Sequence, residues 1–278
     1  MIAGLVLLAG GAAAGVFGSL LGLGGGILIV PLLTFVFGLP LREAVAVSLV
    51  CVIVTSSASA GVYLQRHTAN LRLGMVLELF TASGALAGGL VAFLLSDRVL
   101  AGLFAALLTY VAVSMFRAGR KAQAAASAPT GAAPALDTGA PAPGSFTATL
   151  GGDDYSVRRL RTGMAGSVFA GLVSALLGVG GGIVKVPVMN LVMGVPLKVA
   201  TATSNMMIGI TATSSAVIYL LRGQIDPYVA GPTALGVFAG AMIGSRVAAR
   251  IDVRLLRLLF IVVMIYNAIQ MALKALAL

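Results

Sequence analysis

The sequence predicts an all-α integral membrane protein built from two copies of one helical unit. The chain of 278 residues is 59% hydrophobic and only 9% charged, whereas a soluble chain carries roughly a quarter charged residues. Apolar runs of about twenty residues recur along it, which is the length that crosses a bilayer when wound as helix. One glycine-rich motif also occurs twice. We therefore expect a multi-pass protein of the plasma (inner) membrane.

The repeat keeps its register without gaps. Gly15–Gly26 reads GVFGSLLGLGGG, and Gly171–Gly182 reads GLVSALLGVGGG. The same spacing brings Val30-Pro31 onto Val186-Pro187. Matched motifs at a constant spacing indicate a duplicated unit, as in many transporters.

Each copy contains a glycine-broken apolar element followed by three apolar helices. The broken elements lie at residues 2–38 and 163–194 and have an apolar stretch, a glycine cluster, a shorter apolar stretch and a proline. The expected transmembrane helices are Glu43–Leu64, Leu71–Leu95, Val99–Phe116, Val199–Leu221, Pro227–Ala249 and Val253–Ala272. Each is about long enough to cross the membrane. The sequence leaves open whether the broken elements are re-entrant hairpins or pairs of short helices that cross and return.

The two copies are joined by a segment of different composition. Residues 120–149 are rich in Ala, Pro, Gly, Ser and Thr and contain almost no large apolar side chain. Such a segment buries too little surface to offset the entropy lost on ordering it. We place the membrane repeats at residues 1–117 and 161–278, and a flexible linker at residues 118–160.

The distribution of basic residues predicts that the two copies have inverted topology. The net charge is +10, from 18 Lys and Arg against 8 Asp and Glu. If each broken element returns to the side from which it entered, most Lys and Arg fall on one side, as the positive-inside rule requires of the cytoplasm. If each crosses once, the two sides are nearly equal. We therefore expect inverted repeats, a cytoplasmic linker and both termini outside.

The paired glycine clusters are the first candidate for a substrate site. Four glycines in five positions are costly in a helix, and broken backbone at membrane depth persists only where protein or water satisfies its polar groups. A helix that restarts after the break presents free N–H groups and a positive dipole end, which favour an anion. Close helix packing is the alternative. We assign to the anion site Gly24, Gly25, Gly26, Gly180, Gly181 and Gly182.

Four polar residues near the clusters are candidate contacts to the anion. Lys185 lies in an apolar stretch where the other copy has Ile29, and an ionisable side chain at that depth suggests function. A lysine that snorkels to the interface is the alternative. Ser48, Ser204 and Asn205 can donate hydrogen bonds to an oxyanion without adding negative charge. The other Ser and Thr residues of these helices fit helix packing better.

Glu78 is a carboxylate well inside an expected span. It suits proton exchange in a coupled transporter, and the alternatives are that it snorkels or pairs with Arg66 or Arg72. Cys51 is the only cysteine and His67 the only histidine, so we expect no metal site, no internal disulfide and no cofactor. No Walker A motif is present, and we expect no enzymatic activity.

The glycine motifs resemble those of the TauE/SafE family of membrane permeases, often called sulfite exporters. The likeness is carried by Gly15–Leu32 and Gly171–Met189, and it continues into Ala44–Leu49 and Ala200–Asn205. The resemblance implies transport of small sulfur-containing anions, such as sulfite, sulfoacetate or related organosulfonates. It also implies export and dependence on the proton-motive force.

These observations together predict a secondary transporter that exports small sulfur oxyanions by alternating access between inverted halves. The expected partners are the anionic substrate and the lipid bilayer, without nucleic acid, and a homodimer is left open. Two other classes also stay open. One is a passive anion channel that uses the same helix ends, and the other is a membrane subunit that requires a partner.

Overall fold

The computed structural model confirms the all-helical class. It describes residues 2–21, 26–65, 69–126, 150, 155–247 and 253–277. The first copy consists of α1 (Ile2–Leu21), α2 (Gly26–Pro31), the π-helical turn η1 (Leu32–Val36), α3 (Leu41–Gln65), α4 (Leu71–Leu94) and α5 (Asp97–Ala126). The second consists of α7 (Leu160–Leu177), α8 (Gly182–Pro187), the π-helical turn η2 (Val188–Val192), α9 (Leu197–Leu221), α10 (Pro227–Val247) and α11 (Val253–Ala277).

Six helices are long and apolar enough to cross a membrane, judged by length and composition within the described residues. They are α3, α4, α5, α7, α9 and α10. Helix α7 joins this group although the sequence placed most of it in a broken element, because its 18 residues are predominantly apolar. The described apolar stretch of α11 is shorter and covers Phe260–Leu276.

The two broken elements have the same internal construction. In each copy a first helix ends before the glycine cluster, and a six-residue helix follows and passes directly into a π-helical turn. Pro31 and Pro187 stand at these junctions. Proline lacks the N–H that would close the next helical hydrogen bond, so the winding changes there.

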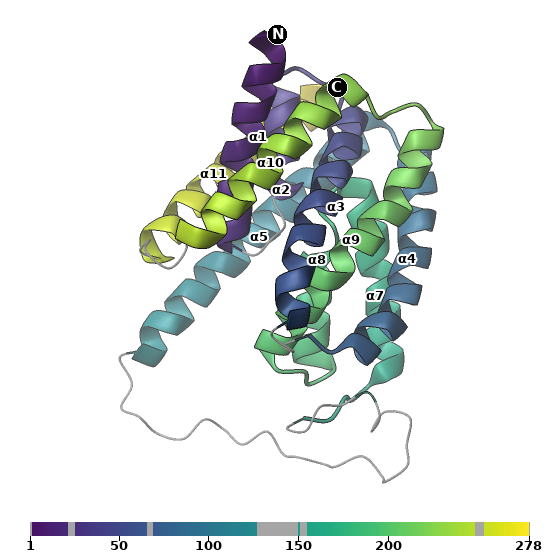
Figure 1. Ribbon diagram of the computed structural model, residues 1–278, viewed down its shortest axis with the longest axis vertical. Helices are drawn as coiled ribbons and strands as arrows, with labels where there is room; N and C mark the ends of the chain where they lie inside the picture. The colour runs from purple at the N-terminus through teal and green to yellow at the C-terminus, as the bar shows by residue number, and fades with distance from the viewer. Residues whose placement is uncertain are drawn as a thin grey trace.

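The two copies pack by exchanging their first helices. Helix α1 lies along α10 of the second copy, and α7 lies along α4 of the first (Figure 1). A methyl group at Gly84 would overlap the carbonyl oxygen of Val168, and one at Gly240 would overlap that of Ala12. These glycines therefore allow the close approach of helix backbones that the small-residue pattern predicts.

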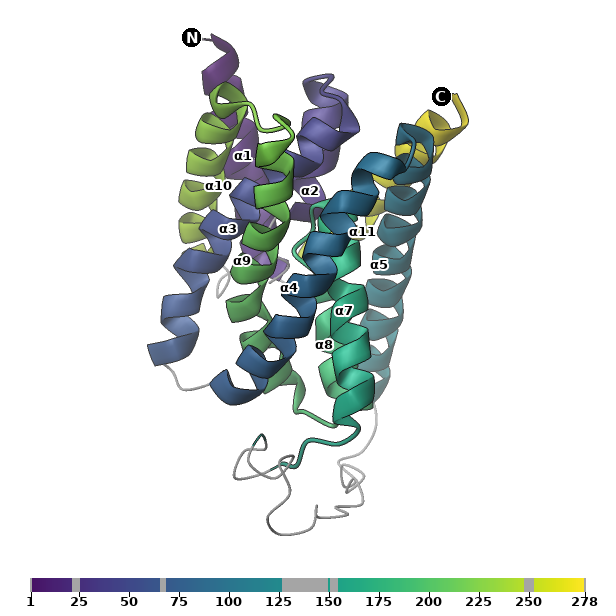
Figure 2. The ribbon, with the colours of Figure 1, turned by 90° about the vertical axis from the view of Figure 1, so that its right-hand side faces the viewer.

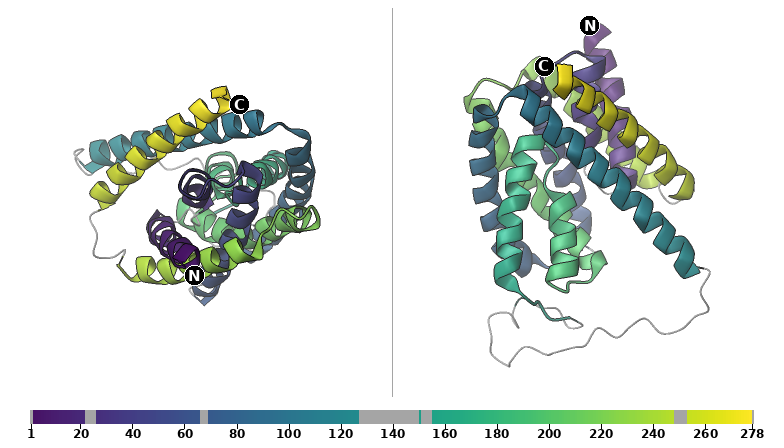
Figure 3. Two further views of the ribbon diagram at one scale, coloured as in Figure 1. Left: turned by 90° about the horizontal axis from the view of Figure 1, so that it is seen from above. Right: turned by 180° about the vertical axis from the view of Figure 1, so that it is seen from behind.

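The remaining helices form the centre and one edge of the bundle. Helices α3 and α9 pack against each other, and α5 and α11 lie side by side along one edge (Figure 3). Helix α1 begins at the end of the molecule where α11 ends, whereas α5 ends and α7 begins at the opposite end (Figures 1 and 2). The first helices of the two copies therefore run in opposite directions.

Parts of the expected linker are helical or packed. Helix α5 continues to Ala126, past the expected boundary at residue 117, because the residues that follow favour helix. Near the other boundary, Leu150 and Val157 are buried in a cluster with Met189 of η2 and with Met193, which follows η2. Asn70, which caps α4, donates hydrogen bonds from Nδ2 to the carbonyl of Leu150 and to the hydroxyl of Tyr155, both at 2.8 Å. Residues 127–149 and 151–154 lie outside the described residues.

Candidate functional site

The glycine break of the second copy is a left-handed stretch of backbone. Gly178, Gly180 and Gly181 have φ values of +68°, +80° and +75°, a region that residues with a Cβ rarely adopt. Helix α7 therefore ends at Leu177, and α8 begins at Gly182 with the amides of Val184 and Lys185 bonded to the carbonyl of Gly181. The predicted break is confirmed in this copy.

Ser48 connects the glycine segments of both copies. Its hydroxyl, on α3, approaches the carbonyl oxygens of Gly26 at 3.2 Å and Gly178 at 2.8 Å, in a three-centre hydrogen bond. The two segments therefore meet at one point of the bundle. Gly24 and Gly25, also predicted for the anion site, lie outside the described residues.

Ser204, the repeat counterpart of Ser48, is placed differently. It is fully buried on α9, and within the described part of the chain its hydroxyl has no hydrogen-bond partner. Ser174 on α7 shows the same combination. A Cβ at Gly182 would lie 3.5 Å from Ser204 Oγ, and one at Gly181 would lie 3.3 Å from Ser174 Cβ. Two buried hydroxyls with unused hydrogen-bonding capacity therefore flank the break, which is costly unless a ligand or water completes them.

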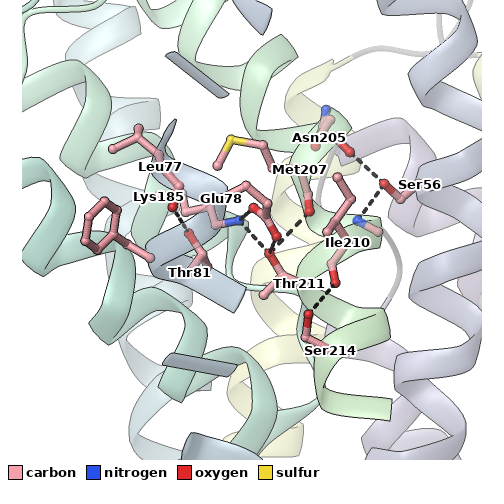
Figure 4. Close-up of polar contacts among 12 residues, drawn as sticks. Ser56, Leu77, Glu78, Thr81, Lys185, Asn205, Met207, Ile210, Thr211 and Ser214 are labelled. Carbon is pink, nitrogen blue, oxygen red and sulfur yellow. Dashed lines mark hydrogen bonds and ion pairs between the residues drawn. The ribbon is translucent and has the colours of Figure 1, made fainter. Parts of the chain in front are cut away.

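A second polar centre lies on α4, α8 and α9, where three side chains point toward one another (Figure 4). Lys185 Nζ lies 2.9 Å from Glu78 Oε2 and donates a hydrogen bond of 2.7 Å to Thr211 Oγ1. The Thr211 hydroxyl also lies 2.7 Å from Glu78 Oε1. All three residues are buried, with exposed fractions of 2% for Lys185, 5% for Glu78 and 0% for Thr211.

The packing of α4 against α7 explains why this centre forms. Gly84 and Gly88 on α4, and Gly171 on α7, lie so close to the opposing backbone that a Cβ at any of them would overlap it. The close contact places Glu78, less than two turns before Gly84, beside the short helix that follows α7. Lys185 is on that helix. The carboxylate and the ammonium group come from different copies, so only the exchanged packing brings them together.

The sequence grouped Lys185 with the serines, and the structure separates them. Thr211 and Ser204 are both on α9, seven residues apart, which corresponds to about 10 Å along a helix. Lys185 therefore belongs to the centre with Glu78, and Ser48 and Ser204 belong to the crossing of the glycine segments. The pairing of Glu78 with Arg72 that the sequence left open is wrong, because Lys185 is its partner. Arg66 lies outside the described residues.

Asn205 lies where α3 crosses α9. Its backbone carbonyl accepts a hydrogen bond of 2.7 Å from Ser56 Oγ, which in turn accepts one of 2.9 Å from the amide of Gly209 (Figure 4). The residue is buried, with 8% of its surface exposed. These contacts join the two copies near the glycine crossing, and a role of the Asn205 side chain in anion binding stays a prediction.

Sequence reasoning missed two residues of the candidate site: Ser174, which it did not single out, and Thr211, which it assigned to helix packing. One signal could have found Thr211: it is two turns beyond Ser204 on the same side of the helix, since seven residues make about two turns. No group of three or more His, Cys, Asp or Glu residues that could hold a metal ion occurs among the described residues.

Comparison with known proteins identifies the family of the chain. The family described as Sulfite exporter TauE/SafE matches residues 7–271. The chain belongs to the TauE/SafE family. It is also similar to the probable membrane transporter protein YunE of Bacillus subtilis (strain 168), with 25% identity over 276 residues and 96% of each chain covered. No solved structure gives a significant match. As a TauE/SafE member the protein is a membrane transporter.

Proposed function

We propose that this protein is a secondary transporter of small sulfur-containing oxyanions, such as sulfite, sulfoacetate or related organosulfonates, and that it works in the export direction. The observation that carries the proposal is Lys185, a lysine with 2% exposure on an apolar helix beside the glycine break. A buried cation at membrane depth is costly and marks a substrate path by default. The family's description as sulfite exporters supports the choice of anion.

The two copies act as inverted halves that alternate around this region of the membrane. The opposite directions of α1 and α7 support the inversion (Figure 1). The exchanged pairs, α1 with α10 and α7 with α4, are packed in a similar close way, which supports two equivalent halves. The linker and the basic loops lie in the cytoplasm, as the positive-inside rule favours.

The anion binds between the two polar centres. Lys185 supplies the charge, and Ser204, Ser174 and the amides at the start of the α8–η2 segment supply hydrogen bonds. Two observations support this position: the unpartnered hydroxyls of Ser174 and Ser204 beside the break, and the lysine on the same segment. Ser48 holds the two glycine segments together through its three-centre hydrogen bond.

Transport by purified protein in proteoliposomes tests the proposal. We expect saturable exchange of radiolabelled sulfite or sulfoacetate by the wild-type chain and loss of at least about 90% of the rate in Lys185→Met, since removing the partner of a buried anion leaves its charge unpaired. Lys198→Met is the matched control, because Lys198 is exposed at the start of α9. Its rate should equal that of the wild type.

Normal transport by folded Lys185→Met would overturn the site, and non-saturable flux without countertransport would indicate a channel. A thermal-shift screen with sulfite, sulfoacetate, taurine, thiosulfate and sulfate identifies the anion, because a ligand of the folded state raises the apparent melting temperature.

A further inference from the structure

We propose that Glu78 competes with the substrate for Lys185, so that an anion binds only together with one proton taken up by Glu78. The inference rests on the proposed function and adds the coupling mechanism of the same site. In the structure the ammonium group of Lys185 is already engaged, by Glu78 Oε2 at 2.9 Å and by Thr211 Oγ1 at 2.7 Å. These contacts use two of the three N–H donors of the ammonium group, and the carboxylate already neutralises its charge. An incoming anion therefore competes with the carboxylate for the charge of Lys185.

Charge balance explains why a proton must accompany the anion. The pair as it stands carries one negative and one positive charge, with a net charge of zero. A monoanion added beside ionised Glu78 would leave a net charge of −1 among buried residues, which is costly at low dielectric. Protonation of Glu78 restores neutrality, since the carboxylic acid is uncharged and the anion then pairs with Lys185. One proton thus balances each added negative charge.

Thr211 is suited to both states. Its hydroxyl bridges the pair, at 2.7 Å from Glu78 Oε1 and 2.7 Å from Lys185 Nζ. A hydroxyl has one hydrogen to donate and also accepts. It therefore continues to accept from Lys185 and turns its hydrogen toward an anion oxygen or toward the Met207 carbonyl, which lies 3.2 Å away. The Thr211 hydroxyl therefore keeps hydrogen-bond partners when the anion replaces the carboxylate.

Among the charged groups on the helices around Glu78, Lys185 is the one that contacts its carboxylate. Helix α4 also carries Arg72, α7 carries Arg161, and α9 carries Lys198 and is followed by Arg222. All four side chains are exposed near the ends of these helices. Tyr219 on α9 is buried, but its hydroxyl donates to the carbonyl of Ala175.

The equivalent position of the other copy holds Ile29, Ala234 and Thr55, which brings no charge. Of these two equivalent positions, only the one with Glu78 therefore has a carboxylate that can take up a proton.

The linkage has a definite consequence for transport. Proton and monoanion occupy the site together and cross in the same direction, so the loaded site carries no more charge than the empty one. Movement of a monoanion is then electroneutral, and its direction follows the sum of the anion and proton gradients. Export, as proposed above, takes place where the outward gradient of the anion exceeds any inward gradient of protons.

Binding of methanesulfonate to the purified full-length protein tests the linkage, because the charge of this monoanion is constant from mildly acidic to mildly basic pH. Isothermal titration calorimetry should show the wild-type affinity falling about tenfold for each unit of rising pH in the range where Glu78 is ionised. Glu78→Gln should bind tightly at every pH, since a neutral amide mimics the protonated carboxyl. Glu43→Gln, a carboxylate in the first turn of α3, is the matched control and should follow the wild type.

A measurement on the unaltered chain covers the case in which Glu78→Gln fails to fold. In weakly buffered solution, the wild-type protein should take up about one proton for each methanesulfonate bound. Equal, pH-independent binding by the wild type and Glu78→Gln, or binding without proton uptake, would overturn the linkage and leave the transporter proposal standing. Absence of methanesulfonate binding by both proteins at every pH would overturn both.

Discussion

The two copies of the repeat pack in the same way, but the equivalent positions differ in charge. In one position Glu78, Lys185 and Thr211 form a buried ion pair bridged by a hydroxyl. The counterpart holds Ala234, Ile29 and Thr55, which are also buried, and the Thr55 hydroxyl donates to carbonyls of its own helix. Duplication thus supplied a symmetric scaffold, and only a few side chains made one of its two equivalent positions charged.

The difference shows how a membrane protein can separate structural from functional requirements. The small residues that let helices approach are present on both sides, at Gly84 and Gly240 and at Gly15 and Gly171. The charged residues are present on one side. A buried ion pair is weak support for stability, because desolvation offsets most of its attraction. The equivalent position of the other copy packs without an ion pair, so packing does not require one. The ion pair of Glu78 and Lys185 therefore favours a role in transport.

The largest expected effect comes from breaking the ion pair. Lys185→Met should lower the free energy of unfolding by about 3–5 kcal/mol, since it leaves the buried carboxylate of Glu78 without a partner. The double variant Glu78→Gln with Lys185→Met should recover most of that loss, because it makes the site resemble its uncharged counterpart. Thermal or denaturant unfolding in detergent measures both. A double variant as unstable as Lys185→Met would show that the two positions are not equivalent in packing.

An intermediate effect is expected at the shared helix contacts. Gly84→Ala and Gly240→Ala should each cost about 1–3 kcal/mol, because the added methyl group meets a backbone carbonyl that cannot move aside easily. Gly102→Ala in α5 is the control, since a Cβ there meets nothing within 4 Å and alanine favours helix. Unfolding experiments on the three variants test whether the scaffold is symmetric. A large cost at Gly84 together with none at Gly240 would argue against that symmetry.

The smallest effect should distinguish the two equivalent serines. Ser48→Ala should lower the free energy of unfolding by about 1 kcal/mol, because two glycine carbonyls lose their hydroxyl donor. Ser204→Ala should leave stability unchanged within about 0.5 kcal/mol, since its hydroxyl has no partner among the described residues, but it should weaken anion binding. Unfolding and titration with the anion separate these outcomes. Equal stability loss in both variants would mean that Ser204 is a packing residue.

Most of the scaffold could be predicted from the sequence. Helices α3, α4 and α9 begin within two residues of their expected starts, and α10 and α11 begin at them, because apolar length and flanking polar residues are local signals. Helix α5 continues to Ala126, beyond the boundary expected at residue 117. The sequence did not predict this, because composition alone does not distinguish a charged helix end from a linker. The break at Gly178–Gly182 was visible in the glycine spacing, because few residues besides glycine adopt the left-handed conformations found there.

The candidate site was predicted in part. Lys185 and Glu78 each stood out as ionisable residues in apolar surroundings, but nothing in their spacing indicates that they are partners, since they are 107 positions apart. Thr211 looked like one hydroxyl among many along α9. The separation of Lys185 from Ser48 and Ser204 could not be predicted either. It depends on the Lys185 side chain reaching Thr211 on α9, and a linear sequence does not show how far a side chain reaches along a neighbouring helix.

The sequence by itself determined that the protein is a helical membrane protein with two related halves and breaks at the glycine clusters. These features depend on local hydrophobicity, on backbone conformation and on a repeat that can be read directly. The tertiary structure decided which charges meet. Exchange of α1 and α7 between the halves brings a carboxylate of one copy to a lysine of the other, because glycines on α4 and α7 allow the two backbones to touch.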